Sequence, residues 1–135
     1  GRDVFLFQGR TPVEGDSPLS AAYFRTAVVG GTQGGDVVAD YQVGVDVLDF
    51  FADGLSGRYV EATTTASNYQ DALAIANNNL RLNPNAIFSA VEIVSSTSGA
   101  SGLLIFMETS GDDTADQQVF LQGVSASNFD GTFIV

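Results

Sequence analysis

Short apolar runs, separated by turns rich in glycine, asparagine and aspartate, make up most of the chain. Runs of about four to eight residues that are rich in Val, Ile, Phe and Thr are typical of β-strands. The predicted strands span residues 4–7, 36–41, 45–51, 58–66, 87–94, 103–108 and 118–124. Strands therefore dominate the predicted structure.

Residues 67–83 follow a different period and predict a helix. Their apolar side chains recur at roughly helical spacing. Ser67 and Gln70 match a capping box at the start of this segment. The sequence Asn83-Pro84-Asn85 is expected to end the helix, because proline disfavours helical backbone in the residue before it.

A shorter helix is expected at residues 18–26, with Ser17 as its N-cap and Pro18 in the first helical position. The chain is thus predicted to be mainly β with one or two helices, a β-rich α+β fold. Its 135 residues are enough to bury a core, so residues 1–135 are expected to form a single domain. The predicted core contains Phe5, Phe7, Val47, Leu48, Leu73, Leu80, Ile93, Leu104, Phe106 and Leu121.

The net charge of the chain argues against some classes of binding partner. Five basic residues, all arginine, face sixteen acidic ones, which gives a formal net charge of −11 at pH 7. Binding to a phosphate backbone or to an anionic lipid surface depends on clustered cations, so neither is expected. No apolar run approaches the ~20 residues that span a bilayer, so no membrane insertion is expected either.

The missing residue types point away from catalysis. Cysteine, histidine and lysine are absent, which removes disulfides, thiolate and imidazole metal ligands, the commonest general base and Schiff-base formation. We therefore do not expect an enzyme. A hydrolase acting through paired carboxylates is the alternative, and it needs two acids facing one cleft.

One short motif occurs three times. Gly-x-Asp, followed one residue later by a large apolar residue, is present at residues 1–5, 34–38 and 44–48. The glycine permits a tight turn, the aspartate offers oxygen ligands suited to calcium, and the apolar side chain points inward. A turn that opens a strand is the simpler interpretation of each copy by itself.

The longer context resembles the C-terminal region of RTX proteins, the calcium-binding, repeat-bearing proteins that bacteria export by type I secretion. RTX domains, including those of serralysin-type proteases, commonly leave their roll of repeats through Gly-x-Asp-x-Phe-x-Phe and a loop with Asp-Ser. Asp-x-Ile-x-Asp-Phe, a turn and Gly-x-Asp-x-Ile-Asp-Leu then follow. The same order is found here at residues 1–7, 16–17, 36–41 and 44–50. Full Gly-Gly-x-Gly-x-Asp repeats are missing.

The second half also resembles the ends of such proteins. It has an apolar strand at 103–107, an acidic turn at 111–116 and a Leu-x-Gly-Val strand end at 121–124. The resemblance makes residues 129–135 a candidate secretion signal, read through Asp130, Phe133, Ile134 and Val135. The alternative is an edge strand that completes the sheet.

The resemblance, which extends to surface-layer RTX proteins, implies a C-terminal capping domain that follows an RTX β-roll. Such a domain carries the type I secretion signal and supports calcium-coupled folding after export. The implied partners are upstream RTX repeats of the same chain and an ABC transporter, an adaptor and an outer-membrane channel. The implied location is extracellular, secreted from or on the surface of a Gram-negative bacterium. The alternative is a self-associating structural module of a calcium-dependent surface layer or adhesin.

Aspartates beside glycine turns are the candidate calcium ligands. Residues two or four apart in a strand share a face, so Asp36 and Asp40 are expected to project together and to meet Asp3. Stacked carboxylates repel unless a cation neutralises them, so either calcium or the arginines Arg2 and Arg58 are expected beside them. The candidate set is Asp3, Asp36, Asp40, Asp46 and Asp49, with Ca²⁺ as the implied cofactor.

Overall fold

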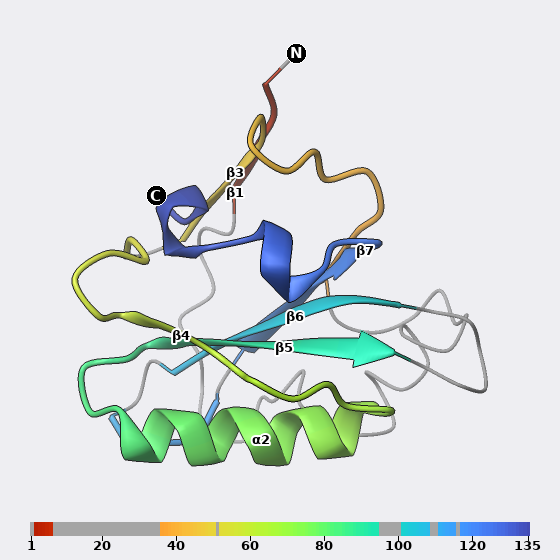
Figure 1. Ribbon diagram of the computed structural model, residues 1–135. Helices are drawn as coiled ribbons and strands as arrows, with labels where there is room; N and C mark the ends of the chain where they lie inside the picture. The colour runs from red at the N-terminus through yellow and green to blue at the C-terminus, as the bar shows by residue number, and fades with distance from the viewer. Residues whose placement is uncertain (1, 7–35, 51, 95–100, 109–110, 116) are drawn as a thin grey trace.

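The computed structural model describes residues 2–6, 36–50, 52–94, 101–108, 111–115 and 117–135 (Figure 1). These residues form a mostly β structure with one α-helix, which confirms the predicted β-rich α+β class. The elements are β1 (Val4–Leu6), β2 (Asp36–Val38), β3 (Val47–Asp49), β4 (Tyr59–Glu61), α2 (Tyr69–Leu82), β5 (Phe88–Val94), β6 (Ser101–Met107), β7 (Gln117–Gln122), η1 (Ala126–Asn128) and η2 (Gly131–Phe133).

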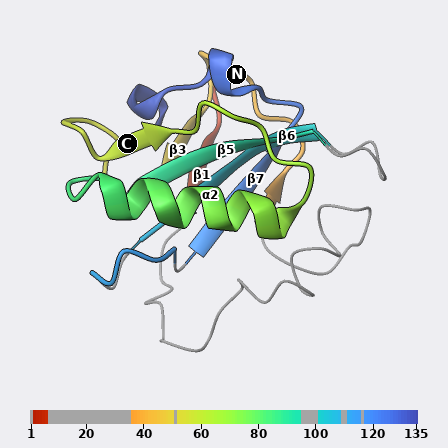
Figure 2. The same ribbon diagram turned by 60° about the horizontal axis from the view of Figure 1, so that its bottom comes forward.

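The main sheet has five strands in the order β2-β7-β6-β5-β4. Its centre is antiparallel, with β6 between β5 and β7, while β2 and β4 join the edges in parallel. Strands β1 and β3 form a separate parallel ladder. Helix α2 runs along one face of the main sheet, and β1, β3 and the C-terminal segment lie on the other side (Figures 1 and 2).

The core therefore has two halves, one on each face of the sheet. On β6, Leu104 and Phe106 pack in the cluster beneath α2, whereas Leu103, Ile105 and Met107 pack on the side of β3. This division follows from the period of two in a strand, because successive side chains point to opposite faces. A strand buried on both faces appears as an unbroken apolar run, as β6 does in the sequence.

Helix α2 begins one residue later than the capping box predicted. Its N-cap is Asn68, whose Oδ1 accepts a 2.9 Å hydrogen bond from the Asp71 backbone N–H, and Ser67 precedes it. The helix ends at Leu82, as expected, with Asn83 as its C-cap before Pro84. Its buried residues recur every three or four positions and face the sheet: Tyr69, Ala72, Ala76 and Leu80.

The predicted core is largely confirmed. Buried residues include Val47, Leu48, Leu80, Ile93, Leu104, Phe106 and Leu121. Leu73 is only partly buried. The side chain of Phe5, the whole of Phe7 and the helix expected at 18–26 lie outside the described residues. Within the described segments, no helix combines the length and the apolar character needed to cross a membrane.

Two leucines of α2 provide a matched test of this packing. Leu80 is 2% exposed against the sheet, whereas Leu82, two residues later, is 63% exposed. Leu80→Ala is expected to lower the free energy of unfolding by about 2–5 kcal/mol, because it removes buried methyl groups and leaves a cavity. Leu82→Ala should stay within about 0.5 kcal/mol of the parent chain. Urea unfolding followed by circular dichroism measures both, and equal losses would contradict the orientation of α2.

Candidate functional site

Two of the three Gly-x-Asp motifs lie side by side in register. Strand β1 pairs with β3 in parallel so that Val4 lies opposite Val47 and Phe5 lies opposite Leu48. These positions are the same ones in each copy of the motif. The third copy lies elsewhere, because its Asp36 begins β2 and pairs with Val119 of β7 in the main sheet.

The Asp46 carboxylate joins the two stacked copies. Its Oδ1 accepts a 2.8 Å hydrogen bond from the backbone N–H of Asp3, and its Oδ2 accepts one of 2.8 Å from the backbone N–H of Gln42. The Asp46 side chain is fully buried. One carboxylate therefore ties β1 to β3 and at the same time closes the turn that precedes β3.

That turn explains why the motif begins with glycine. The Gln42 carbonyl accepts hydrogen bonds from the N–H groups of Val45 and Asp46, at 3.0 and 2.9 Å. Gly44, within the turn, has a φ of +80°, in the left-handed region that glycine adopts without a steric penalty. The hydroxyl of Tyr41 donates a 2.8 Å hydrogen bond to the Asp46 carbonyl, which fixes the entry to β3.

Hydrogen bonding sets the charge state of Asp46. The backbone N–H groups of Asp3 and Gln42 hold the pKa of this carboxyl below its ordinary value, although burial acts in the opposite direction. Asp46 is therefore charged at neutral pH, and its charge is satisfied by backbone dipoles. A buried carboxylate that used no such donors would destabilise the fold.

The other candidate calcium ligands are spread over the structure. Asp3 is exposed at the start of β1, Asp49 is half-buried at the end of β3, and Asp40 is exposed in a bend. Asp36 and Asp40 were expected to lie on one face of a single strand. This expectation is wrong, because β2 ends at Val38 and Asp40 lies beyond it. Among the residues that the structure describes, no three acidic groups lie close enough to hold one metal ion.

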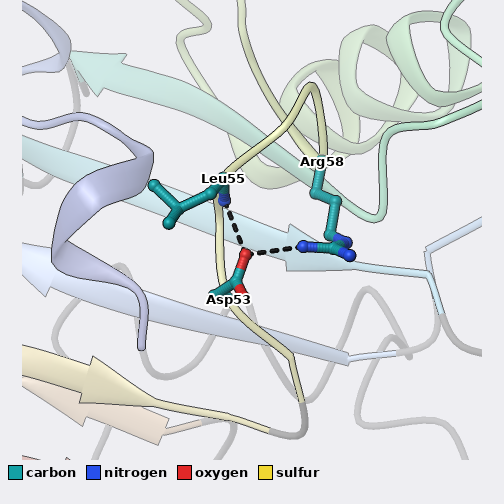
Figure 3. Close-up of polar contacts among 3 residues, drawn as sticks. All are labelled: Asp53, Leu55 and Arg58. Atoms are coloured by element: carbon teal, nitrogen blue, oxygen red, sulfur yellow. Dashed lines mark hydrogen bonds and ion pairs between the residues drawn. The ribbon is translucent and has the colours of Figure 1, made fainter.

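Arg58, expected as a possible counter-charge for the stacked aspartates, has a different partner. Its guanidinium contacts the Asp53 carboxylate at 2.7 Å, and the same oxygen accepts a 2.9 Å hydrogen bond from the Leu55 N–H (Figure 3). The Leu55 N–H and Arg58 lower the pKa of Asp53 against the opposing effect of burial. Both side chains of the pair are 42% exposed, so it orders the loop before β4 more than it stabilises the fold.

The C-terminal residues complete the β1–β3 ladder from the other side. The N–H of Val135 donates a 2.8 Å hydrogen bond to the Leu48 carbonyl, and the Val135 carbonyl accepts a 3.3 Å hydrogen bond from the N–H of Phe50. Ile134 pairs with Leu48 in a parallel bridge and is buried. Of the candidate signal residues, then, Ile134 is inside the core, Phe133 is half-buried, and Asp130 and Val135 are exposed.

Two glycines allow the C-terminal segment to take this position. The backbones of Gly54 and Gly131 lie so close that a Cβ on Gly54 would stand 2.5 Å from the Gly131 carbonyl oxygen. The Gly54 N–H also donates a 3.2 Å hydrogen bond to the Ile134 carbonyl. The Asp130 carboxylate caps η2 by accepting the Thr132 N–H at 2.7 Å. Neither glycine belongs to a sequence pattern that would have predicted this contact.

A second group of carboxylates was missed by the sequence analysis. Glu61 on β4 accepts a 3.1 Å hydrogen bond from the Tyr59 hydroxyl, and Glu92 on β5 accepts one of 2.8 Å from the Ala126 N–H. Burial raises the pKa of Glu61, and the charges of Glu92 and Asp130 raise it further, while the Tyr59 hydrogen bond lowers it. The available signal was a glutamate at position 92, inside an otherwise apolar run.

A shallow depression of about 420 Å³ lies where α2 begins. The Asp71 carboxylate at its rim accepts hydrogen bonds from Asn68 and Ser67, so this acid serves the helix terminus. The depression is open to solvent and is lined by Thr65, Ala66, Ser67, Asp71, Ala74, Ile75 and Val94.

Comparison with known proteins returned no match to a family model, to a curated protein or to a solved structure. The stacked motifs and the C-terminal segment that closes their ladder are therefore the features on which a function can be argued.

Asp46→Asn tests whether the charge of the Asp46 carboxylate stabilises the contact between β1 and β3, and its effect on stability is expected to depend on pH. Because the folded pKa of Asp46 lies below 3.8, its ordinary value, its stabilisation is full above that pH and is lost as the pH falls through the folded value. The urea midpoint of the variant should be lower than that of the parent at pH 7, and the gap should narrow below about pH 4.

Asp40→Asn is the matched control, because it removes the same charge from an exposed position. Its urea midpoint should follow that of the parent at both pH values. If the difference in urea midpoint between Asp46→Asn and the parent were unchanged in acid, the carboxylate charge would contribute nothing to the contact between β1 and β3.

Proposed function

We propose that this chain is the C-terminal capping and secretion-signal domain of an RTX-type calcium-binding protein exported by type I secretion. The observation that carries the proposal is the parallel pairing of β1 with β3, in which Val4 and Phe5 of the first motif lie opposite Val47 and Leu48, the matching positions of the motif at 44–48. Repeats of this kind form a roll when successive copies stack in parallel, so a final pair of stacked copies is what the end of a roll would leave in its cap.

The arrangement around β3 supports a capping role. Leu48, at the centre of β3, is fully buried in the same cluster as Phe88, Phe129 and Ile134. On one side β3 pairs with β1, and on the other it bonds to the C-terminal residues. A ladder that ends against a packed core has no exposed strand edge at that end, which is the requirement for a cap.

Burial of the C-terminal segment constrains when a transporter can read it. Ile134 and Phe129 are buried, and the polar backbone of Val135 is bonded to β3. A transporter that recognises these apolar side chains must therefore meet the chain before it folds. Folding after export then places the same residues where they close the ladder.

Calcium binding gives a physical reason why the chain would fold only after export. The formal net charge of −11 opposes compaction, and cation binding that occurs only in the folded form offsets it. Ca²⁺ at ~100 times its dissociation constant adds about 2.7 kcal/mol per site. We assign this coupling to the upstream repeats themselves, because both oxygens of Asp46 within this domain already accept backbone N–H groups.

Export is the direct test, with variants that separate the signal from the fold. A chain with Asp130→Asn, Phe133→Ser and Val135→Ser keeps the buried Ile134, and its export by a matched type I system should fall about tenfold or more, a loss of about 1.4 kcal/mol in recognition. Immunoblots of medium and cell fractions measure the exported share.

Gly131→Ala is the matched control. It keeps every candidate signal side chain but places a Cβ against the Gly54 backbone, so it weakens the folded state. If the signal is read before folding, Gly131→Ala should still be exported. Undiminished export of the triple variant would remove the signal from the proposal.

Calcium coupling has its own measurement. Thermal unfolding of the domain joined to its upstream repeats should move to higher temperature with Ca²⁺ than with chelator, because the folded form alone binds the ion. A smaller shift is expected for residues 1–135 alone. Superimposable curves for the joined protein would contradict any structural role for calcium.

A further inference from the structure

The β1–β3 ladder has one closed edge and one open edge. β3 is bonded to β1 on one side and to the C-terminal residues on the other. Within the described part of the chain, β1 has no partner beyond β3. The Asp3 carbonyl accepts a 3.1 Å hydrogen bond from the Val47 N–H, so the backbone of Asp3 faces β3. In a parallel ladder, the N–H and C=O of the next residue, Val4, then point the other way.

Equivalent positions in the two copies differ in exposure. Val47, on a strand flanked by β1 and by the C-terminal residues, is 7% exposed, while Val4 at the matching position of β1 is 55% exposed. One further strand paired with β1 in the same register would give Val4 a neighbouring strand on both sides, as Val47 has. The apolar side chain and the outward-facing backbone of Val4 thus mark the same edge.

The two aspartates differ in the same way. Asp46 uses its Oδ1 to accept the N–H of the matching aspartate in the next copy, Asp3. Asp3 is exposed, and none of the described residues donates a hydrogen bond to its carboxylate. Repeating the relation between the copies by one step puts the backbone N–H of a third aspartate within reach of the Asp3 carboxylate.

We propose that the outer edge of β1 binds an extended Gly-x-Asp-x-apolar segment in parallel register, and that Asp3 accepts the backbone N–H of that segment's aspartate. The segment continues an interface that the chain already contains, which identifies its chemistry. The inference rests on the proposed function, in which such segments are the upstream repeats of the same polypeptide.

The recognition chemistry is hydrogen bonding, not metal coordination. An asparagine side chain still offers a carbonyl oxygen to an N–H donor, whereas alanine offers none. A calcium site also takes carbonyl oxygens of asparagine as ligands, so only a comparison with and without Ca²⁺ separates it from a hydrogen bond. Asp3→Asn and Asp3→Ala test whether an acceptor oxygen is needed, and the comparison with Ca²⁺ and chelator tests for a metal ion.

Disulfide trapping tests the register in a chain that has no cysteine of its own. Val4→Cys is placed in the 135-residue chain, at an exposed position. The probe is a synthetic peptide of the sequence of residues 44–50 carrying Val47→Cys. Facing residues of paired strands bring their Cα atoms within the range that a disulfide spans. A peptide carrying Val45→Cys instead has the same composition and places its thiol two residues out of register.

In a glutathione redox buffer, intact mass spectrometry measures the yield of the mixed disulfide. The in-register peptide should give about ten times more adduct than the shifted peptide, a ratio equivalent to about 1.4 kcal/mol. Asp3→Asn, which loses the charge but keeps an acceptor oxygen, should keep part of this preference, and Asp3→Ala should lose most of it. Ca²⁺ and chelator should give the same yields. Circular dichroism confirms that each variant is folded.

Three results would overturn the inference. Equal yields from the two peptides would show that β1 does not select this register. A preference that is lost in Asp3→Asn as fully as in Asp3→Ala, or that depends on Ca²⁺, would show that Asp3 does not act as a simple hydrogen-bond acceptor. Disulfide-linked pairs of the variant chain that outcompete the adduct would make the edge a self-association surface. Each can occur while the export of the parent chain is normal, so the proposed function is tested separately.

Discussion

The fold of the N-terminal ladder depends on one buried carboxylate. Asp46 meets an N–H from its own turn and an N–H from a residue 43 positions earlier in the chain, so a local and a long-range constraint share one side chain. Neither donor carries a charge, and the carboxylate remains ionised because backbone dipoles replace the lost hydration. Once Asp46 is held, Leu48 enters the core at a defined position, and both β1 and the C-terminal residues align along β3.

Both ends of the described chain contact β3, and each is held there by a different interaction. β1 aligns through the Asp3–Asp46 hydrogen bond, whereas the C-terminal segment fits because Gly54 and Gly131 let two backbones approach closely. Interior packing leaves little room for adjustment, so a single added methyl group at that contact must displace backbone. The C-terminal residues are thus a structural part of the domain, which is compatible with a signal only if recognition precedes folding.

The acidic side chains do not form a single site in the described structure. Asp46 and Asp53 accept backbone N–H groups, Asp130 caps η2, and Glu92 accepts the N–H of Ala126. The Asp71 carboxylate accepts hydrogen bonds from the side chains of Ser67 and Asn68 at the start of α2. Asp46, a candidate calcium ligand, and Asp130, a candidate signal residue, therefore each have a local structural role as well. Hydrogen bonds from backbone N–H groups lower the pKa values of Asp46 and Asp53, whereas burial raises the pKa of Glu61 and favours its neutral form.

The sequence by itself determined the elements whose signals are local. The spacing of the apolar residues predicted the helix at 67–83 and the strands around Ile93, Leu104 and Leu121. These predictions were possible because the buried face of a helix or strand is determined by residues that are close together in the sequence. The tertiary structure decided which strands pair. It paired β1, from the first copy of the motif, with β3, from the copy at 44–48, and it paired β2, from the remaining copy, with β7, although all three share one motif. Pairing across tens of residues depends on packing and loop closure that no five-residue pattern encodes, and the same long-range packing decided that Ile134 is buried and that Gly54 meets Gly131.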